Sequence, residues 1–156
     1  MATVKTQGTE IFFIDSVTGA TDTLVKLSCP TGITGLGGAA DQIDTTCLEA
    51  TERTYVRGLA NPGQVSVPFN FHPDETSHQV LFELKDDGSV LHWCICLSDG
   101  TTDPTLSGGI FSGPASRTNA KFDAYVSDVN IDIATNEVVR GTLTLQRSGA
   151  VTWAFA

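Results

Sequence analysis

The segment from Thr31 to Phe71 constrains the fold most, because two alternating runs flank a long connection within it. A glycine-rich turn, Gly35–Gly38, leads into the first run, Asp41 to Leu48, and the second run is Gln64 to Phe71. Alternation of this kind is typical of β-strands with one buried face. The connection Glu49–Gly63 is long for a compact domain, where such loops are usually functional or disordered. The sequence therefore predicts two strands joined by a long loop.

This loop is not composed like a disordered linker. It carries the apolar residues Tyr55, Val56 and Leu59 among charged ones, whereas disordered segments are poor in such groups. Apolar groups that lie off their own sheet commonly contact another surface. We therefore expect the loop to be structured and to contact a partner, and the alternative is a free surface loop.

Short alternating runs continue along the rest of the chain and predict a β-rich protein. We expect Ser89–Leu97, which is apolar on nearly both faces, to be a central strand. Pro68 cannot donate to a ladder, so its strand should be an edge or bulged there. A change of apolar phase near Ser127–Asp128 predicts a bulge. The further predicted strands are Glu10–Asp15 and Thr23–Cys29, joined by a turn, with Lys121–Ala134, Glu137–Gln146 and Val151–Phe155.

One helix is predicted over Asp74–Lys85. Acidic residues open it and Lys85 closes it, as the helix dipole favours, and Gly88 follows as a stop signal. The residues that form its apolar stripe are Ser77, Val80, Leu81 and Leu84. A second long loop, rich in Gly, Ser, Thr and Pro, is predicted over Ser98–Ala120, and Met1–Gly8 should be a flexible arm.

Length and charge limit the classes of protein to consider. The 156 residues indicate one domain, 1–156, with a mean hydropathy of +0.03 and 17% charged residues. The net charge of -9 argues against binding nucleic acid by phosphate neutralisation. No apolar signal segment opens the chain, and no run approaches the roughly 20 apolar residues of a membrane span. We interpret Cys29, Cys47, Cys94 and Cys96 as structural thiols that stay reduced in a cytoplasm.

Few residue patterns favour chemistry. His92, Cys94 and Cys96 share a strand face and could bind a metal with His72 or His78, but zinc ligands are usually paired across a turn. A Cys/His nucleophile pair on one strand would splay apart, and no orienting carboxylate is evident nearby. The glycines at 35, 37 and 38 precede no P-loop lysine. We therefore expect no catalytic residue, no cofactor and no metal.

The order of these features resembles the tail tube (major tail) protein of long, non-contractile-tailed bacteriophages. The run that carries the resemblance is GLGGAADQIDTTCLEATERTYVRGLANPGQVSVPFNFHPDETSHQVLFEL, preceded by KTQGTEIFFID. Its family features are the glycine-rich turn, an acidic DxIDxT strand at Asp41–Thr46, a loop ending in GLxxPG at Gly58–Gly63, and a helix opening at Pro73–Asp74 with His78–Gln79. Residues 5–97 carry the match, and the later part matches only as a β-rich tail.

The resemblance implies a mainly β fold: a two-sheet β-sandwich or partial barrel with one flanking helix. Its strands would join a continuous barrel in a hexameric ring, and stacked rings would conduct genomic DNA, without specific binding, from capsid to host. The implied partners are further copies of the chain, a tape measure protein, a tail terminator and distal tail proteins, with no membrane. The tube would lie in the virion after assembly in the host bacterial cytoplasm.

Two other classes remain open. A type VI secretion tube shares the architecture and would carry effectors instead of DNA. A β-sandwich binding module, such as a carbohydrate binder, usually offers exposed aromatic residues. Trp93 and Trp153 both fall in apolar runs, which predicts that both lie in the core.

The resemblance also gives the loops and acids expected roles. The loop should pack on an adjacent subunit or ring through Glu49, Glu52, Arg53, Tyr55, Val56, Arg57 and Leu59. An acidic lumen would repel the polyanionic duplex weakly and let it slide. The candidate lumen residues are Asp41, Asp44, Asp128 and Asp132. Residues 98–120 and 1–8 should be mobile until assembly orders them.

Overall fold

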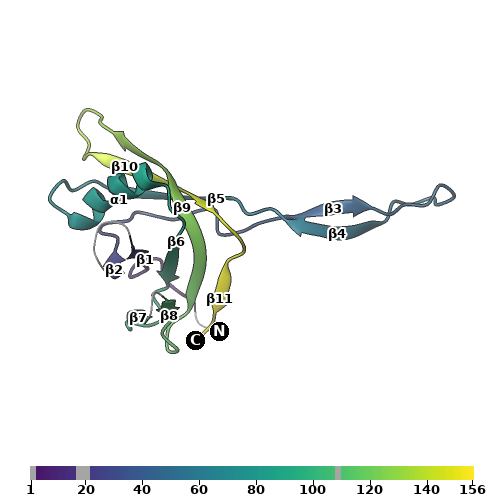
Figure 1. Ribbon diagram of the computed structural model, residues 1–156, viewed down its shortest axis with the longest axis horizontal. Helices are drawn as coiled ribbons and strands as arrows, with labels where there is room; N and C mark the ends of the chain where they lie inside the picture. Colours follow the sequence, from purple (N-terminus) through teal and green to yellow (C-terminus); the bar gives the residue numbers. More distant parts are fainter. Residues whose placement is uncertain (1–2, 17–21, 108–109) are drawn as a thin grey trace.

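A computed structural model describes residues 3–16, 22–107 and 110–156 (Figure 1). The fold is mainly β with one helix, as the sequence predicts. The elements are β1 (Glu10–Asp15), β2 (Thr23–Lys26), β3 (Ala40–Asp44), β4 (Tyr55–Ala60), β5 (Gln64–Asn70), α1 (Thr76–Asp87), β6 (Leu91–Cys96), β7 (Thr105–Ser107), β8 (Ile110–Ser112), β9 (Asn119–Asp132), β10 (Arg140–Arg147) and β11 (Thr152–Ala154). Most of the turn predicted between β1 and β2 lies outside the described residues.

Seven strands form one antiparallel sheet in the order β2-β1-β6-β9-β10-β5, and β11 pairs with the beginning of β9. The central position predicted for the 89–97 strand is confirmed, since β6 lies between β1 and β9. The edge position predicted from Pro68 is confirmed as well, because β5 ends the order. Residues 30–34 cover that edge through bridges from Pro30 to Phe69 and from Thr34 to Ser66.

The predicted bulge in the long strand β9 is confirmed. Thr144 pairs with Asp128 and the next residue, Leu145, pairs with Val126, so Ser127 is the extra residue. The bulge changes the phase of the alternation. As a result Val126 and Val129 are both buried, although they are three residues apart.

The main core lies between the inner face of this sheet and α1. Phe13 and Trp93 pack with ring centroids 4.8 Å apart, and both are fully buried. The predicted apolar stripe of α1 is buried. The helix itself begins two residues later than predicted, so no acid lies in its first turn. Gly88 ends it as predicted, in the left-handed conformation, with its N–H donating to the Leu84 carbonyl at 3.0 Å.

The segment 98–120, predicted to be one long loop, forms the small β7–β8 sheet and opens β9. Phe111 of β8 packs on the outer face of β1 and β6, against Phe12, Ile14, Cys94 and Cys96. Apolar burial therefore holds part of this segment in place in the single chain. The sequence prediction failed because strands of three residues are too short to show a period.

Arg117 fixes the same segment from inside. Its side chain is completely buried, and its Nε donates to the Leu97 carbonyl at 2.5 Å. Its Nη2 donates to the Gly8 carbonyl at 2.9 Å and lies 3.6 Å from Glu10 Oε1. The described part of the amino-terminal arm is thus attached to the body. No helix among the described residues has the length and apolar character needed to cross a membrane.

Candidate assembly surfaces

The structure corrects the loop predicted over Glu49–Gly63. Residues Tyr55–Ala60 form β4, which pairs antiparallel with β3, so the segment is half of a long β-hairpin. The hairpin projects well away from the main sheet (Figure 1). The structure describes every residue from Pro30 to Gln64, and none of them is buried.

The hairpin has two different faces. Directly paired residues share a face, so Ile43 lies beside Val56 on one side. Asp44 lies beside Tyr55, and Gln42 beside Arg57, on the other side. Ile43 and Val56 are each 53% exposed, and Leu59 is 85% exposed. The hairpin therefore presents one apolar face and one polar face, and neither is covered.

A tight turn forms the tip of the hairpin. The Ala50 N–H donates to the Cys47 carbonyl at 3.0 Å, which leaves Leu48 and Glu49 as the central turn residues. Leu48 is fully exposed. Glu52 and Arg53 follow the turn and are exposed as well.

The glycine-rich turn carries the chain past β5 into the hairpin. Gly35 has φ +96°, and a Cβ there would lie 2.0 Å from the Gln64 carbonyl oxygen, so only glycine fits. Arg147, at the end of β10, is buried, and its guanidinium donates to the carbonyls of Leu36 and Gly37. The base of the hairpin is thereby attached to the main sheet.

Asp41 and Asp44 cannot act as one lumen pair. They are three residues apart on β3, so their side chains point to opposite faces. A Cβ added to Gly58 would lie 3.4 Å from both the Asp41 Cβ and the Ile43 Cγ1, which puts Asp41 on the apolar face. Hydrogen bonds from the Thr46 side chain and backbone amide lower the pKa of Asp44 below its ordinary value.

Asp128 and Asp132 do share a face. Both follow the bulge in β9 and alternate with the buried Val129. Lys85 Nζ lies 3.1 Å from Asp128 Oδ1, and Asn130 Nδ2 donates to Asp132 Oδ1 at 3.1 Å. Their cross-strand neighbours on the same face are Thr144, Thr142 and Arg140. This face of β9 and β10, turned away from the core, is polar and carries two acids and one base.

Trp93 is buried as predicted, but Trp153 is 40% exposed, so its predicted core position is wrong. It lies on the three-residue strand β11 and stacks on Phe155, with centroids 6.2 Å apart. Trp153 also lines a cavity of about 240 Å³ at the base of the hairpin, beside Arg57 and Arg147. The sequence prediction failed because β11 pairs with β9 at the margin of the main sheet, away from the helix that covers the core.

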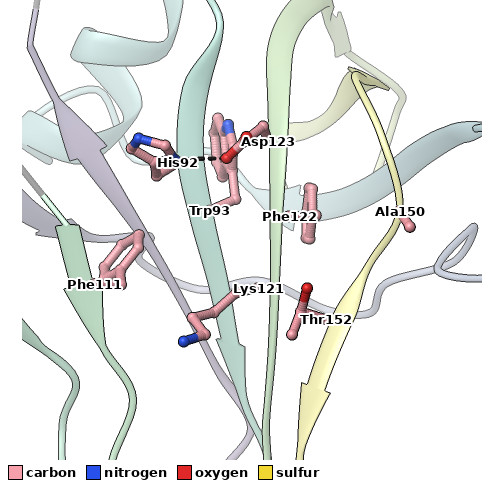
Figure 2. A pocket seen from close by; sticks show the side chains of 8 residues that line it. All are labelled: His92, Trp93, Phe111, Lys121, Phe122, Asp123, Ala150 and Thr152. Carbon is pink, nitrogen blue, oxygen red and sulfur yellow. Dashed lines mark hydrogen bonds and ion pairs between the residues drawn. The ribbon is translucent and has the colours of Figure 1, made fainter.

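A second cavity, of about 230 Å³, lies between β8 and β11 (Figure 2). In it the His92 Nδ1 lies 2.5 Å from Asp123 Oδ1, so β9 supplies the orienting carboxylate that the sequence did not reveal. The neighbouring thiol is unsuited to attack. Contact with Cys96 at 3.9 Å and burial raise the pKa of the Cys94 thiol well above its ordinary value. Neither Cys94 nor Cys96 lines this cavity, so the His92–Asp123 pair has no thiol beside it there.

The remaining polar candidates have structural surroundings. His78 is buried; it accepts a hydrogen bond from the His72 N–H at Nδ1 and lies 2.7 Å from the Ser28 carbonyl at Nε2. The predicted run Asp41–Leu48 placed Cys47 in a strand. This is wrong, because Cys47 lies in the exposed hairpin tip, after the end of β3. Among the described residues, no three His, Cys, Asp or Glu side chains are placed to hold a metal ion.

Comparison with known proteins decides the family. The family described as "Phage tail tube, TTP, lambda-like" matches residues 2–156. "Structural protein 3" of Pseudomonas phage PAJU2 is 39% identical over 151 residues, which cover 94% of this chain and 90% of that protein. The chain belongs to the lambda-like phage tail tube family. It is a structural protein of the phage virion.

Solved structures share the fold of this tail tube protein at low identity. The SPP1 tail tube subunit gives a TM-score of 0.66 at 11% identity, covering 99% of this chain and 80% of that one. The tail of an empty gene transfer agent particle gives 0.64 at 13% identity, covering 93% and 96%. A subunit of the sheath–tube complex of an extracellular contractile injection system gives 0.68 at 13% identity, covering 99% and 93%.

Sequence reasoning missed several residues of the tail tube protein's surfaces. Ile43 alternates with Gln42 and Asp44, so its pairing with the apolar loop residue Val56 was available as a signal. Leu48, between Cys47 and Glu49, shows no period of its own. Arg117 and Arg147 give no sequence signal, since arginines are usually exposed.

Proposed function

We propose that this tail tube protein forms hexameric rings that stack into the tube through which genomic DNA passes from capsid to host. The observation that carries the proposal is the projecting β3–β4 hairpin with its uncovered apolar side chains (Figure 1). The solved relatives include a gene transfer agent tail with C6 symmetry and the SPP1 tail tube. The C6 symmetry of the gene transfer agent tail supports a six-fold arrangement for this chain, and the SPP1 structure supports a tube.

A free hairpin of this kind needs a partner. An isolated two-stranded hairpin is marginally stable in water unless a third strand or a packed surface supports it. The apolar face here, Ile43 with Val56, is not covered by the chain's own body. A neighbouring subunit or ring would supply that surface. We therefore assign interface roles to Glu49, Glu52, Arg53, Tyr55, Val56, Arg57 and Leu59.

A ring also explains the open sheet. The main sheet is not closed: residues 30–34 cover the β5 edge only through two isolated bridges, and β2 at the other end of the strand order pairs with no second strand among the described residues. Exposed sheet edges favour uncontrolled pairing between chains. Joining the sheets of adjacent subunits into one barrel removes that hazard. A heterologous contact that closes on itself gives a ring, and complementary ring faces give a stack.

The polar face of β9 and β10 is our candidate for the lumen lining. It carries Asp128 and Asp132 with Thr142, Thr144 and Arg140, and Lys85 of α1 lies 3.1 Å from Asp128 as a second base. Acids facing the duplex repel it only within about 8 Å at physiological salt. The repulsion would keep DNA from sticking without blocking its passage. Asp41 and Asp44 lie on opposite faces of the hairpin, so at most one of them could also face the lumen.

Further expectations follow from the same proposal. The tube should meet a tape measure protein inside it and terminator and distal tail proteins at its ends. Assembly should occur in the host bacterial cytoplasm, and the chain should have no enzymatic role.

The test is to replace residues 40–60 with an Asn-Gly turn. The Asn61 N–H donates to the Ala39 carbonyl at 3.0 Å, so the two ends are already adjacent. We expect a folded monomer that forms no tubes in negative-stain microscopy, whereas the unmodified chain forms tubes at the same concentration. Normal tubes from the deletion variant would contradict the role of the hairpin.

The lumen has its own test. Asp128→Lys with Asp132→Lys should leave tubes intact, since lumen groups make no ring contacts, but the tubes should retain duplex DNA at low salt and release it at high salt. Double-lysine tubes that bind no DNA at any salt concentration would remove these acids from the lumen.

A type VI secretion tube is the second candidate function. A type six secretion system protein shares the fold, with a TM-score of 0.51 at 17% identity. The family match favours the phage tube. A binding module would instead remain a small species at high concentration, and the partly exposed Trp153 is the one observation that keeps this class open.

A further inference from the structure

The cavity at the base of the hairpin has an unusual lining. Its volume is about 240 Å³, and apolar groups from Leu36, Pro62, Val151 and Trp153 form much of its wall. Two arginines also line it, and none of its lining residues is acidic. The cavity is therefore suited to a group that combines an apolar side chain with a negative charge.

Arg147 gives a second reason to expect a carboxylate. The residue is 4% exposed, and its two terminal nitrogens donate to the carbonyls of Leu36 and Gly37. Its Nε is buried and has no hydrogen-bond partner. A buried donor without an acceptor is destabilising, and a buried guanidinium more so. A carboxylate entering the cavity would place a negative charge beside this buried guanidinium.

The hairpin tip offers the matching pair. Leu48 and Glu49 are the central residues of the terminal turn, and both are exposed. Leu48 offers an uncovered aliphatic side chain, and Glu49 offers a carboxylate beside it. The chain's own tip cannot fill its own cavity, because the length of the hairpin separates them (Figure 1).

We propose that this cavity receives the Leu48–Glu49 turn of a neighbouring copy of the chain. Leu48 packs against Val151 and Trp153, and the Glu49 carboxylate pairs with Arg57 and Arg147. The contact is heterologous, tip to base, so each copy gives one turn and receives one, and the contact propagates. The inference rests on the proposed tube function and adds the site that receives the hairpin.

Other segments among the described residues also carry exposed apolar groups, such as Phe82 beside Glu83 on α1. Phe155 is 80% exposed and stacks on Trp153, and the Ala156 N–H donates to the Thr118 hydroxyl at 3.2 Å. The turn after β9 exposes Ile133 and Val138 beside Glu137. If one of these segments occupied the cavity in place of the tip, Cys47 would lie away from the cavity wall, and the cross-linking experiment below would give no ladder.

The experiment uses the natural Cys47, which precedes Leu48 and is exposed. Ala150→Cys places a second thiol in the cavity wall, and Cys29→Ser removes the other exposed thiol. Assembled tubes are treated with a short bis-maleimide and analysed on a denaturing gel. We expect a ladder of dimers, trimers and longer chains from tubes, and none from dilute monomer.

Val138→Cys in place of Ala150→Cys is the matched control, since Val138 is exposed but lies in the turn after β9. It should give no ladder. Normal tubes without a ladder from Ala150→Cys would overturn the contact and leave the tube function standing. A failure of the unmodified chain to form any tube would overturn both.

Charge exchange provides an independent readout. Glu49→Arg should raise the critical concentration for tube growth about tenfold, which corresponds to about 1.4 kcal/mol. Glu49→Gln should raise the critical concentration by a smaller factor. Glu49→Arg combined with Arg57→Glu should return the critical concentration close to that of the unmodified chain. Equal critical concentrations for the single and double variants would contradict the pairing.

Discussion

The body of the molecule and the β3–β4 hairpin obey the same rules of strand geometry but bury their side chains in opposite ways. In the body, alternation places Phe13, Trp93 and Leu143 in a core where each is fully buried. In the hairpin, alternation places Ile43 beside Val56, yet both remain half exposed. Alternation of apolar and polar residues normally indicates a buried face. In the hairpin it indicates an apolar face that the single chain leaves exposed.

The difference separates two sources of stability. The body is held by its own contacts, including the buried Arg117 that attaches both the amino-terminal arm and the segment after β6. The hairpin is held mainly at its base, where Arg147 bonds the glycine-rich turn. We therefore expect mutations in the body to change folding, and mutations in the hairpin to change assembly.

The two tryptophans give the largest contrast. Trp93→Ala removes a fully buried ring that packs on Phe13, and should lower the free energy of unfolding by about 3–5 kcal/mol. Trp153→Ala should lower it by less than about 1 kcal/mol, because that ring is 40% exposed and lies at the margin of the main sheet. Denaturant unfolding of the monomer measures both, and similar losses would break the distinction.

Arg117→Met should be the next largest effect. It removes the donors that bind the Leu97 and Gly8 carbonyls inside the body, and should cost about 2–3 kcal/mol of unfolding free energy. Amide exchange should rise in residues 98–107 of the variant. Arg140→Met, at an exposed position, should stay within about 0.5 kcal/mol. A neutral Arg117→Met would show that the segment after β6 is held by other contacts.

The hairpin substitutions should show the reverse behaviour. Ile43→Ala with Val56→Ala should change the unfolding free energy of the monomer by less than about 0.5 kcal/mol, because both side chains lie at the surface. The same double variant should raise the critical concentration for tubes about tenfold. Light scattering against protein concentration measures the second quantity, and an unchanged value would mean that this face stays exposed in the tube.

The smallest effect concerns pH. A hydrogen bond from the Thr118 side chain, with one from its backbone amide, lowers the pKa of Asp99 below its ordinary value. A carboxyl with a depressed pKa in the folded state stabilises the fold above its unfolded pKa, and this contribution is lost as pH falls through the depressed value. Asp99→Asn and Thr118→Val should both flatten the acid limb of the stability curve. If the acid limb is unchanged in both variants, the Asp99–Thr118 hydrogen bond does not contribute to the pH dependence of stability.

The sequence predicted the body better than the hairpin, and the reason is physical. Strands such as β5 and β6 have a buried face, so their composition records their position. The segment Tyr55–Ala60 was predicted to be a loop because Gly58 interrupts it near a register shift, and both of its faces are solvent-exposed. Its apolar residues predict a contact surface, and this stays a prediction. The misplacement of Asp41 and Asp44 on one surface was avoidable, since residues three apart on a strand face opposite ways.

The burial of Arg117 and Arg147 could not be predicted from the sequence. Nothing in the spacing around Arg117 or Arg147 distinguishes them from the exposed Arg53 and Arg140. Their burial depends on carbonyls that lie far away in the sequence, such as those of Gly8 and Leu36. These contacts become visible only when the topology brings the segments together.

Amide hydrogen exchange on monomer and assembled tube tests the central claim most directly. If the hairpin is the element that assembly covers, the amides of residues 40–60 should exchange readily in the monomer and become strongly protected in the tube. The core strands β6 and β9 should show the same protection in both states. Hairpin amides that exchange equally in monomer and tube would contradict the account.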